Sequence, residues 1–108
     1  MGCGEIVTEP VATYEQARNK AQNILGDLGA DSKPYIGRME NSSGYGKVVG
    51  RQTADGKARW RLDYDPELGP HINVEDFRQG KGSSAKKIAI PFAGTEDTVN
   101  SYLKNLNK

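Results

Sequence analysis

Three residue types that often build functional sites are nearly absent from this chain of 108 residues, which has one cysteine, one histidine and one tryptophan. The lone cysteine, Cys3, cannot form an internal disulfide and stands near the start of the chain, so we interpret it as incidental. The lone histidine, His71, excludes every site that needs two imidazoles, such as two-histidine zinc sites and two-histidine nucleases.

Long apolar runs are also missing. No stretch approaches the ~18 apolar residues that mark a membrane-spanning helix, so we expect no transmembrane segment. No basic-then-apolar leader is present, so the sequence as given predicts no secretory signal. Hydrophobic residues make up 35% of the chain, which favours one domain with a thin core.

Neither sign of charge dominates, because 15 basic residues face 14 acidic ones and the formal net charge is +1. The distribution is nevertheless uneven. Residues 1–46 contain four basic and six acidic residues, whereas residues 47–108 contain eleven basic and eight acidic ones. Any basic surface that attracts phosphate is therefore expected in the second part of the chain.

Apolar residues in the first part of the chain recur at steps of three and four, which predicts a helix over residues 14–28. Thr13 stands three residues before Gln16, a spacing typical of a capping box at a helix start. Residues 1–12 show no period. We therefore expect a flexible arm or linker there, followed by a single domain over residues 13–108.

The period then changes to two. Alternation and turn residues predict strands over residues 47–53, 58–64, 71–76 and 87–92. The segment before them is expected to be loop, with at most a short strand near residues 35–39. A second helix follows, with Thr95 as its N-cap. We therefore predict an α+β fold: an N-terminal helix, a twisted antiparallel sheet of about four strands, and a C-terminal helix packed on one sheet face.

Alternation also sorts the side chains of the strands, because successive residues point to opposite faces. Trp60 and Leu62 share one face of their strand, and Ile72 and Val74 share one face of the next. If these apolar faces point to the core, the polar side chains emerge together on the other face. That polar set consists of Arg59, Arg61, Asp63, His71, Asn73, Glu75 and Lys87.

This polar set suits the cleavage of RNA without a metal. Guanidinium forks match phosphate oxygens, and imidazole titrates near neutral pH. The reaction needs a base for the 2′-hydroxyl proton, cations for the phosphate, and an acid for the leaving 5′ oxygen. We take Arg59, Arg61 and Lys87 as phosphate-binding candidates. His71 is the candidate acid or base, and Glu75 either orients it or shares the proton transfer.

Five further residues are candidates for substrate binding, and we expect neither metal nor cofactor. Asn73 shares the polar face, and Tyr64 lies near a strand end, where its ring can stack on a base. The others are candidates for phosphate contacts at a Lys/Ser loop or a helix N-terminus, namely Ser84, Lys86 and Thr95.

Three alternatives stay open. Alternating charges are also typical of an ordinary soluble sheet with cross-strand ion pairs, so the chain is alternatively a non-catalytic module that binds nucleic acid or protein. Asp63, Asp65 and Glu75 suggest a metal-dependent nuclease, although their pattern lacks the glycine and the terminal glutamate of an EF-hand loop. An immunity or adaptor protein would not need His71.

Three runs carry a resemblance to a known family: RWRLDYDP at residues 59–66, GPHINVEDF at residues 69–77 and KKIAIPF at residues 86–92. With the GTE that starts the last helix, they resemble the C-terminal toxin domains of bacterial polymorphic toxins of the contact-dependent inhibition and Rhs type. The resemblance covers roughly residues 47–108 and, more loosely, the first helix. Such domains are assigned to the barnase-like superfamily, which includes EndoU, colicin-type and RelE-type ribonucleases.

The resemblance implies a metal-independent ribonuclease toxin that often acts on tRNA and leaves a 2′,3′-cyclic phosphate. It also implies a cognate immunity protein as partner. The domain would be secreted as part of a larger bacterial toxin and would act in the cytoplasm of the target cell. Only His71 matches a histidine of the family, whereas EndoU-type members use two.

Overall fold

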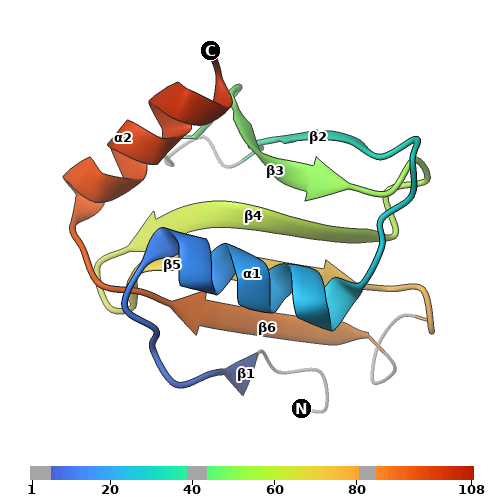
Figure 1. Cartoon of the computed structure of the whole chain (residues 1–108), viewed down its shortest axis with the longest axis horizontal. Coiled ribbons are helices and arrows are strands. Elements are labelled where there is room, and N and C mark those ends of the chain that lie inside the picture. The colour runs from blue at the N-terminus through green and yellow to red at the C-terminus, as the bar shows by residue number, and fades with distance from the viewer. Residues whose placement is uncertain (1–5, 39–43, 81–84) are drawn as a thin grey trace.

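The computed structural model describes residues 6–38, 44–80 and 85–108 (Figure 1). Its elements in chain order are β1 (Ile6–Val7), α1 (Tyr14–Leu25), β2 (Lys33–Ile36), β3 (Val48–Gln52), β4 (Ala58–Asp65), β5 (Gly69–Asp76), β6 (Lys86–Pro91) and α2 (Glu96–Leu106). All the strands join one six-stranded sheet, in the order β1-β6-β5-β4-β3-β2. No helix of the described residues is long and apolar enough to cross a membrane.

The predicted fold class, with about four antiparallel strands, is wrong in the number of strands and in their direction. The sheet has six strands and is mixed, because β1 pairs parallel to β6, with Ile6 opposite Ile88. The second additional strand is β2, which pairs antiparallel to β3. A strand of two residues has no period to detect, and only tertiary pairing with a distant segment reveals it.

Both helices begin at a threonine that the sequence marks as a cap. At the start of α1, the Gln16 amide donates to Thr13 Oγ1 at 3.2 Å. At the start of α2, the Thr95 amide donates to Thr98 Oγ1 at 3.0 Å. The first helix ends three residues earlier than the sequence predicts, because Gly26 adopts a left-handed φ of 73°.

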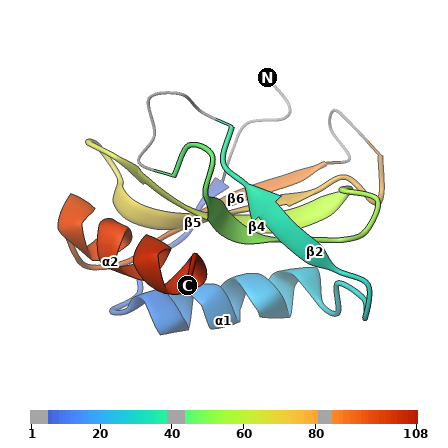
Figure 2. The ribbon, with the colours of Figure 1, turned by 90° about the horizontal axis from the view of Figure 1, so that it is seen from above.

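The two helices lie on the same face of the sheet (Figure 2). The apolar side chains of α1 pack against β4, β5 and β6, and those of α2 pack against β3, β4 and β5. The Tyr14 ring stacks on the Tyr102 ring, with the two centroids 4.1 Å apart. Trp60, Ile72 and Ile90 form the sheet side of this core and are almost fully buried. We call the opposite side of the sheet the open face.

The crossing of β2, β3 and β4 shapes one end of the open face. Gly50 of β3 pairs with Arg61 of β4, and a Cβ added to Gly50 would lie 1.8 Å from the Trp60 carbonyl oxygen. A glycine is therefore needed for this close approach. Gly50 also pairs with Tyr35 of β2, just before a register shift between Tyr35 and Ile36. This register carries the Tyr35 ring to the open face, beside Arg61.

Candidate functional site

Three rows of paired residues cross β4, β5 and β6 on the open face. The register aligns Arg59 with Glu75 and Lys87, then Arg61 with Asn73 and Ala89, and finally Asp63 with His71 and Pro91. The five residues that the sequence predicts as catalytic therefore share one face of the sheet, as does Asn73. Opposite residues in adjacent strands are close enough for their side chains to interact.

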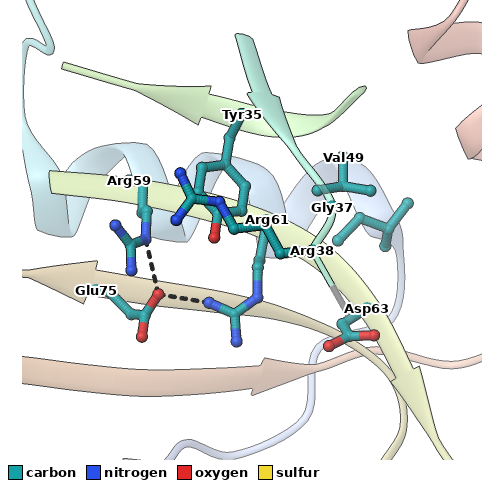
Figure 3. A pocket seen from close by; sticks show the side chains of 9 residues that line it. Tyr35, Gly37, Arg38, Val49, Arg59, Arg61, Asp63 and Glu75 are labelled. Carbon is teal, nitrogen blue, oxygen red and sulfur yellow. Dashed lines mark hydrogen bonds and ion pairs between the residues drawn. The ribbon is translucent and has the colours of Figure 1, made fainter. Parts of the chain in front are cut away.

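Glu75 joins the first two rows, because it accepts hydrogen bonds from both arginines on one oxygen. Arg59 Nε donates to Glu75 Oε1 at 2.8 Å, and Arg61 Nη1 donates to the same atom (Figure 3). Burial would raise the pKa of Glu75, but the two guanidinium groups, Arg61 foremost, outweigh it and lower the pKa below the ordinary 4.5. Glu75 is therefore a carboxylate at neutral pH.

Aromatic rings hold Arg59 in place. Its guanidinium carbon lies 5.0 Å from the centroid of the Tyr35 ring and 5.4 Å from that of the Phe77 ring. Arg59 Nη1 also donates to the Gly56 carbonyl at 3.3 Å. Arg38 stacks on the same Tyr35 ring, at 5.8 Å. With Glu75 as a further partner, Arg59 is fixed before any ligand arrives, which lowers the entropy lost on binding.

These side chains surround a pocket of about 200 Å³. Its lining consists of Tyr35, Gly37, Arg38, Val49, Arg59, Arg61, Leu62, Asp63 and Glu75. Figure 3 shows the Glu75 carboxylate between Arg59 above it and Arg61 beside it, with the Arg38 guanidinium over the Tyr35 ring. Three arginines and two carboxylates give the lining a formal charge of +1. A phosphodiester, with its single negative charge, is therefore a complementary ligand.

Tyr35 and Arg38 are the site residues that sequence reasoning missed. Both lie in a segment that was expected to be mostly loop, and the strand β2 that carries Tyr35 is only four residues long. The Tyr35 side chain is 7% exposed, which matches a role as the support of a guanidinium rather than as a free stacking surface. The nearest sequence signal was the expected short strand at residues 35–39.

His71 lies on the open face as predicted from alternation, but it is 4% exposed and does not line the pocket. Its Nδ1 lies 2.9 Å from the Gly69 carbonyl oxygen. A carbonyl only accepts, so Nδ1 carries the proton and the lone pair of the neutral ring is on Nε2. The polar side chains were predicted to emerge together on this face, but the His71 side chain is buried there.

Asn73 is also buried on this face, with 5% of its surface exposed. Its Oδ1 is shielded from solvent and accepts no hydrogen bond from any residue that the structure describes. Buried polar atoms without a partner are uncommon in folded proteins, and each calls for an explanation.

The other predicted binding residues do not gather at the pocket. Lys87 faces Glu75 across β5 and β6 and is half-buried, but no ion pair joins them among the described residues. Lys86 is exposed at the start of β6, on the opposite side of that strand, and Tyr64 packs against the core beneath the helices. Thr95 begins α2, while Ser84 lies outside the described residues.

Two of the three acidic residues of the metal-dependent alternative, Asp63 and Asp65, bind the local backbone. Asp63 Oδ1 accepts from the Tyr64 amide at 2.8 Å. Asp65 Oδ1 accepts from the amides of Glu67 and Leu68, each at 2.8 Å, and so closes the turn between β4 and β5. Within residues 6–38, 44–80 and 85–108, no three His, Cys, Asp or Glu side chains group closely enough to hold a metal ion.

Comparison of the chain with models of known protein families and with curated protein sequences found no match. The resemblance to toxin domains therefore stays a prediction. What supports a function for this chain is the geometry of the open face: two arginines on one carboxylate, a pocket of matching charge, and an imidazole in the third row.

Proposed function

We propose that this domain is an endoribonuclease that cleaves RNA on the open face without a metal, by transesterification to a 2′,3′-cyclic phosphate. The observation that carries the proposal is the convergence of Arg59 and Arg61 on one oxygen of Glu75 in a pocket of net charge +1. This arrangement combines a phosphate clamp with a proton acceptor, which are two of the three groups that the reaction needs.

The arginines bind the scissile phosphate. A guanidinium has five N–H donors in a fixed fork, so each arginine retains donors after its bond to Glu75. These donors take up the negative charge that grows on the phosphate oxygens in the transition state. Lys87, one strand further and aligned with Glu75, adds a third positive charge to this part of the open face.

Glu75 removes the proton of the 2′-hydroxyl. Both of its described hydrogen bonds end on Oε1, so Oε2 is the oxygen that accepts the proton. A carboxylate with a lowered pKa is a weak base in the free protein. When a phosphate competes for Arg59 and Arg61, their stabilisation of the Glu75 carboxylate weakens. Its pKa therefore rises, and it becomes a better base once substrate is bound.

His71 protonates the leaving 5′ oxygen. The bond from Nδ1 to the Gly69 carbonyl fixes the ring, so that a protonated Nε2 is the donor to substrate. His71 and Glu75 are four positions apart on β5, so about 13 Å separates their Cα atoms. Glu75 reaches towards the second row to meet Arg61, as Figure 3 shows, which shortens the gap between base and acid.

A second candidate is a non-catalytic module that binds RNA through the same arginines. The low exposure of His71 favours it, because an acid must reach the substrate oxygen. Both candidates require RNA binding that weakens as salt rises, and only the first gives cleavage products.

The deciding experiment incubates the purified domain with total RNA and with tRNA at neutral pH in the presence of EDTA. We expect cleavage with 2′,3′-cyclic phosphate ends, and a loss of ~10²–10⁴-fold in rate for His71→Ala. Arg61→Ala should also lose activity, whereas Arg51→Ala, a matched change outside the pocket, should not. Intact RNA with bound protein would favour the binding module, and cleavage restored only by a divalent ion would overturn the metal-free scheme.

The finer parts of the proposal follow from the toxin resemblance. They are tRNA as the preferred substrate, a cognate immunity protein as inhibitor, and delivery into the cytoplasm of a target cell as part of a larger secreted toxin. An immunity protein that inhibits the enzyme by covering the pocket would lose affinity for the Arg61→Ala variant but not for Arg51→Ala.

A further inference from the structure

Two short arms of the chain stand beside the pocket on the open face. One arm is residues 37–38, which follow β2, and the other is residues 44–47, which lead into β3. Figure 2 shows both arms on the side of the sheet that faces away from the helices. The Gly37 amide donates to the Lys47 carbonyl at 2.9 Å, and the Gly46 amide donates to the Gly37 carbonyl at 3.0 Å. These backbone bonds hold the two arms together.

The first arm contributes Arg38, which lines the pocket but takes no part in the chemistry proposed above. Its guanidinium carbon lies 5.8 Å from the centroid of the Tyr35 ring, and that of Arg59 lies 5.0 Å from the same centroid. Arg59 and Arg61 both donate to Glu75. Arg38 is exposed, and no ion pair joins it to a carboxylate within the described residues. Arg38 is therefore placed to bind a second anion beside the one that Arg59 holds.

The second arm contributes Tyr45, which is 55% exposed. Its backbone forms a bridge with Gly37, a residue of the pocket lining, so Tyr45 lies next to the pocket wall. An exposed aromatic ring is a surface on which an unpaired RNA base stacks. Tyr35 does not offer such a surface, because it is buried beneath guanidinium groups.

A phosphate and a base next to each other are what one further nucleotide of an RNA strand presents. We infer that Arg38 and Tyr45 form a subsite for the nucleotide adjacent to the scissile phosphate, in which Arg38 binds the phosphate of that nucleotide and Tyr45 stacks on its base. A base inside a duplex is already stacked and paired, so it is not free to lie on a protein ring. The subsite therefore selects unpaired RNA, such as a loop or a single-stranded end.

This inference rests on the proposed ribonuclease function, and its test uses substrates that either fill the subsite or leave it empty. A dinucleoside monophosphate contains the scissile phosphate alone. Trinucleotides extended at the 5′ or the 3′ end add one phosphate and one base. The kcat/KM for all three is measured with the parent, Arg38→Ala and Tyr45→Ala. Tyr45→Phe and Arg51→Ala are the matched controls, because phenylalanine keeps the ring and Arg51 lies outside the pocket.

We expect one of the two extensions to raise kcat/KM in the parent. On that trinucleotide, Tyr45→Ala should reduce kcat/KM about five- to a hundredfold, and Arg38→Ala about three- to tenfold. Both controls should keep the parental value. Every variant should cleave the dinucleotide at the parental rate, which also shows that the variants are folded. In a hairpin RNA, the parent should cut the loop and leave the stem intact.

Four results would overturn the inference. They are no gain from either extension, a parental kcat/KM for Arg38→Ala or Tyr45→Ala on the trinucleotide, an equal loss on the dinucleotide, and cuts within the hairpin stem. An equal loss would mean that the residue acts at the scissile phosphate or in the fold. If the parent cleaved none of the substrates, the ribonuclease proposal would itself be wrong, whereas the four other results would leave that proposal standing.

Discussion

The two faces of the sheet are built from the same strands, yet they differ in nearly every physical property. The helix-covered face carries the large apolar side chains, such as Trp60 and Ile72, which are almost fully buried. The open face carries the arginines, carboxylates and imidazole in three rows. Because neighbouring residues of a strand point to opposite faces, core packing and the proposed RNA binding fall on alternate positions.

Each face of the sheet also contains a buried polar atom, at Trp60 and at Asn73. Trp60 Nε1 on the helix side and Asn73 Oδ1 on the open face each have no hydrogen-bond partner within residues 6–38, 44–80 and 85–108. An unpaired atom alone therefore does not mark a ligand site.

The largest expected effect is a loss of stability on one face of the sheet and a loss of activity on the other. Ile72 is fully buried, so Ile72→Ala should cost about 2–5 kcal/mol in the free energy of unfolding. The activity of the molecules that remain folded should be unchanged. Arg61→Ala should do the reverse, with most of the cleavage activity lost and a smaller stability change. Urea unfolding and RNA cleavage on both variants test this. If Ile72→Ala and Arg61→Ala lost the same activity per folded molecule, the proposed division of roles between the two faces would be wrong.

The next largest expected effect is the loss of stability when the Glu75 charge on the open face is removed. Glu75→Gln should cost about 1.5–3 kcal/mol at neutral pH, because both arginines lose a charged acceptor. The pKa of Glu75 is lowered in the folded state from the ordinary 4.5. Its contribution is therefore complete above that ordinary value, and it is lost as the pH falls through the lowered folded value.

The stability difference between the parent and Glu75→Gln should accordingly shrink as the pH falls below about 4.5. Glu67→Gln, at an exposed turn, is the matched control. Denaturant unfolding between pH 7 and pH 2.5 measures the difference. A stability difference that stays constant over this pH range would show that the arginines do not stabilise the ionised form of Glu75.

A smaller loss of stability is expected at Arg78, which links the end of β5 to the end of α1. Arg78 donates to both oxygens of Asp76 at the end of β5 and, through Nη2, to the Leu25 carbonyl of α1 at 2.7 Å. It therefore caps the helix from the sheet. Arg78→Ala should cost about 0.5–1.5 kcal/mol and speed up hydrogen exchange of the last α1 amides. Unchanged exchange there would contradict this link between helix and sheet.

Features of the fold that depend on neighbouring residues could be predicted from the sequence, whereas features that depend on pairing between distant segments could not. Alternation within β4 and β5 is local, and it correctly placed Arg59, Arg61 and Glu75 on the face opposite Trp60. The parallel pairing of Ile6 with Ile88 joins opposite ends of the chain and leaves no periodic signal. For that reason the strand count and the antiparallel sheet of the predicted fold were wrong.

The partners of each side chain were harder to predict than the face of the sheet on which it lies. Glu75 was expected to orient His71 or to share its proton transfer, and in the structure it binds the two arginines. Tyr35 reaches the site only through the close crossing at Gly50, which a propensity scale does not encode. The burial of His71 depends on packing across rows, which alternation alone does not determine.

The most direct test of the claim that RNA binds the open face uses side-chain NMR signals of the inactive His71→Ala variant. The single tryptophan provides an indole N–H signal on the helix-covered face, while Arg59 and Arg61 provide Nε–H signals on the open face. Adding a short single-stranded RNA should shift the two arginine signals and leave the Trp60 indole signal unchanged. Unmoved arginine signals on addition of saturating RNA, or a shift of the indole signal alone, would contradict it.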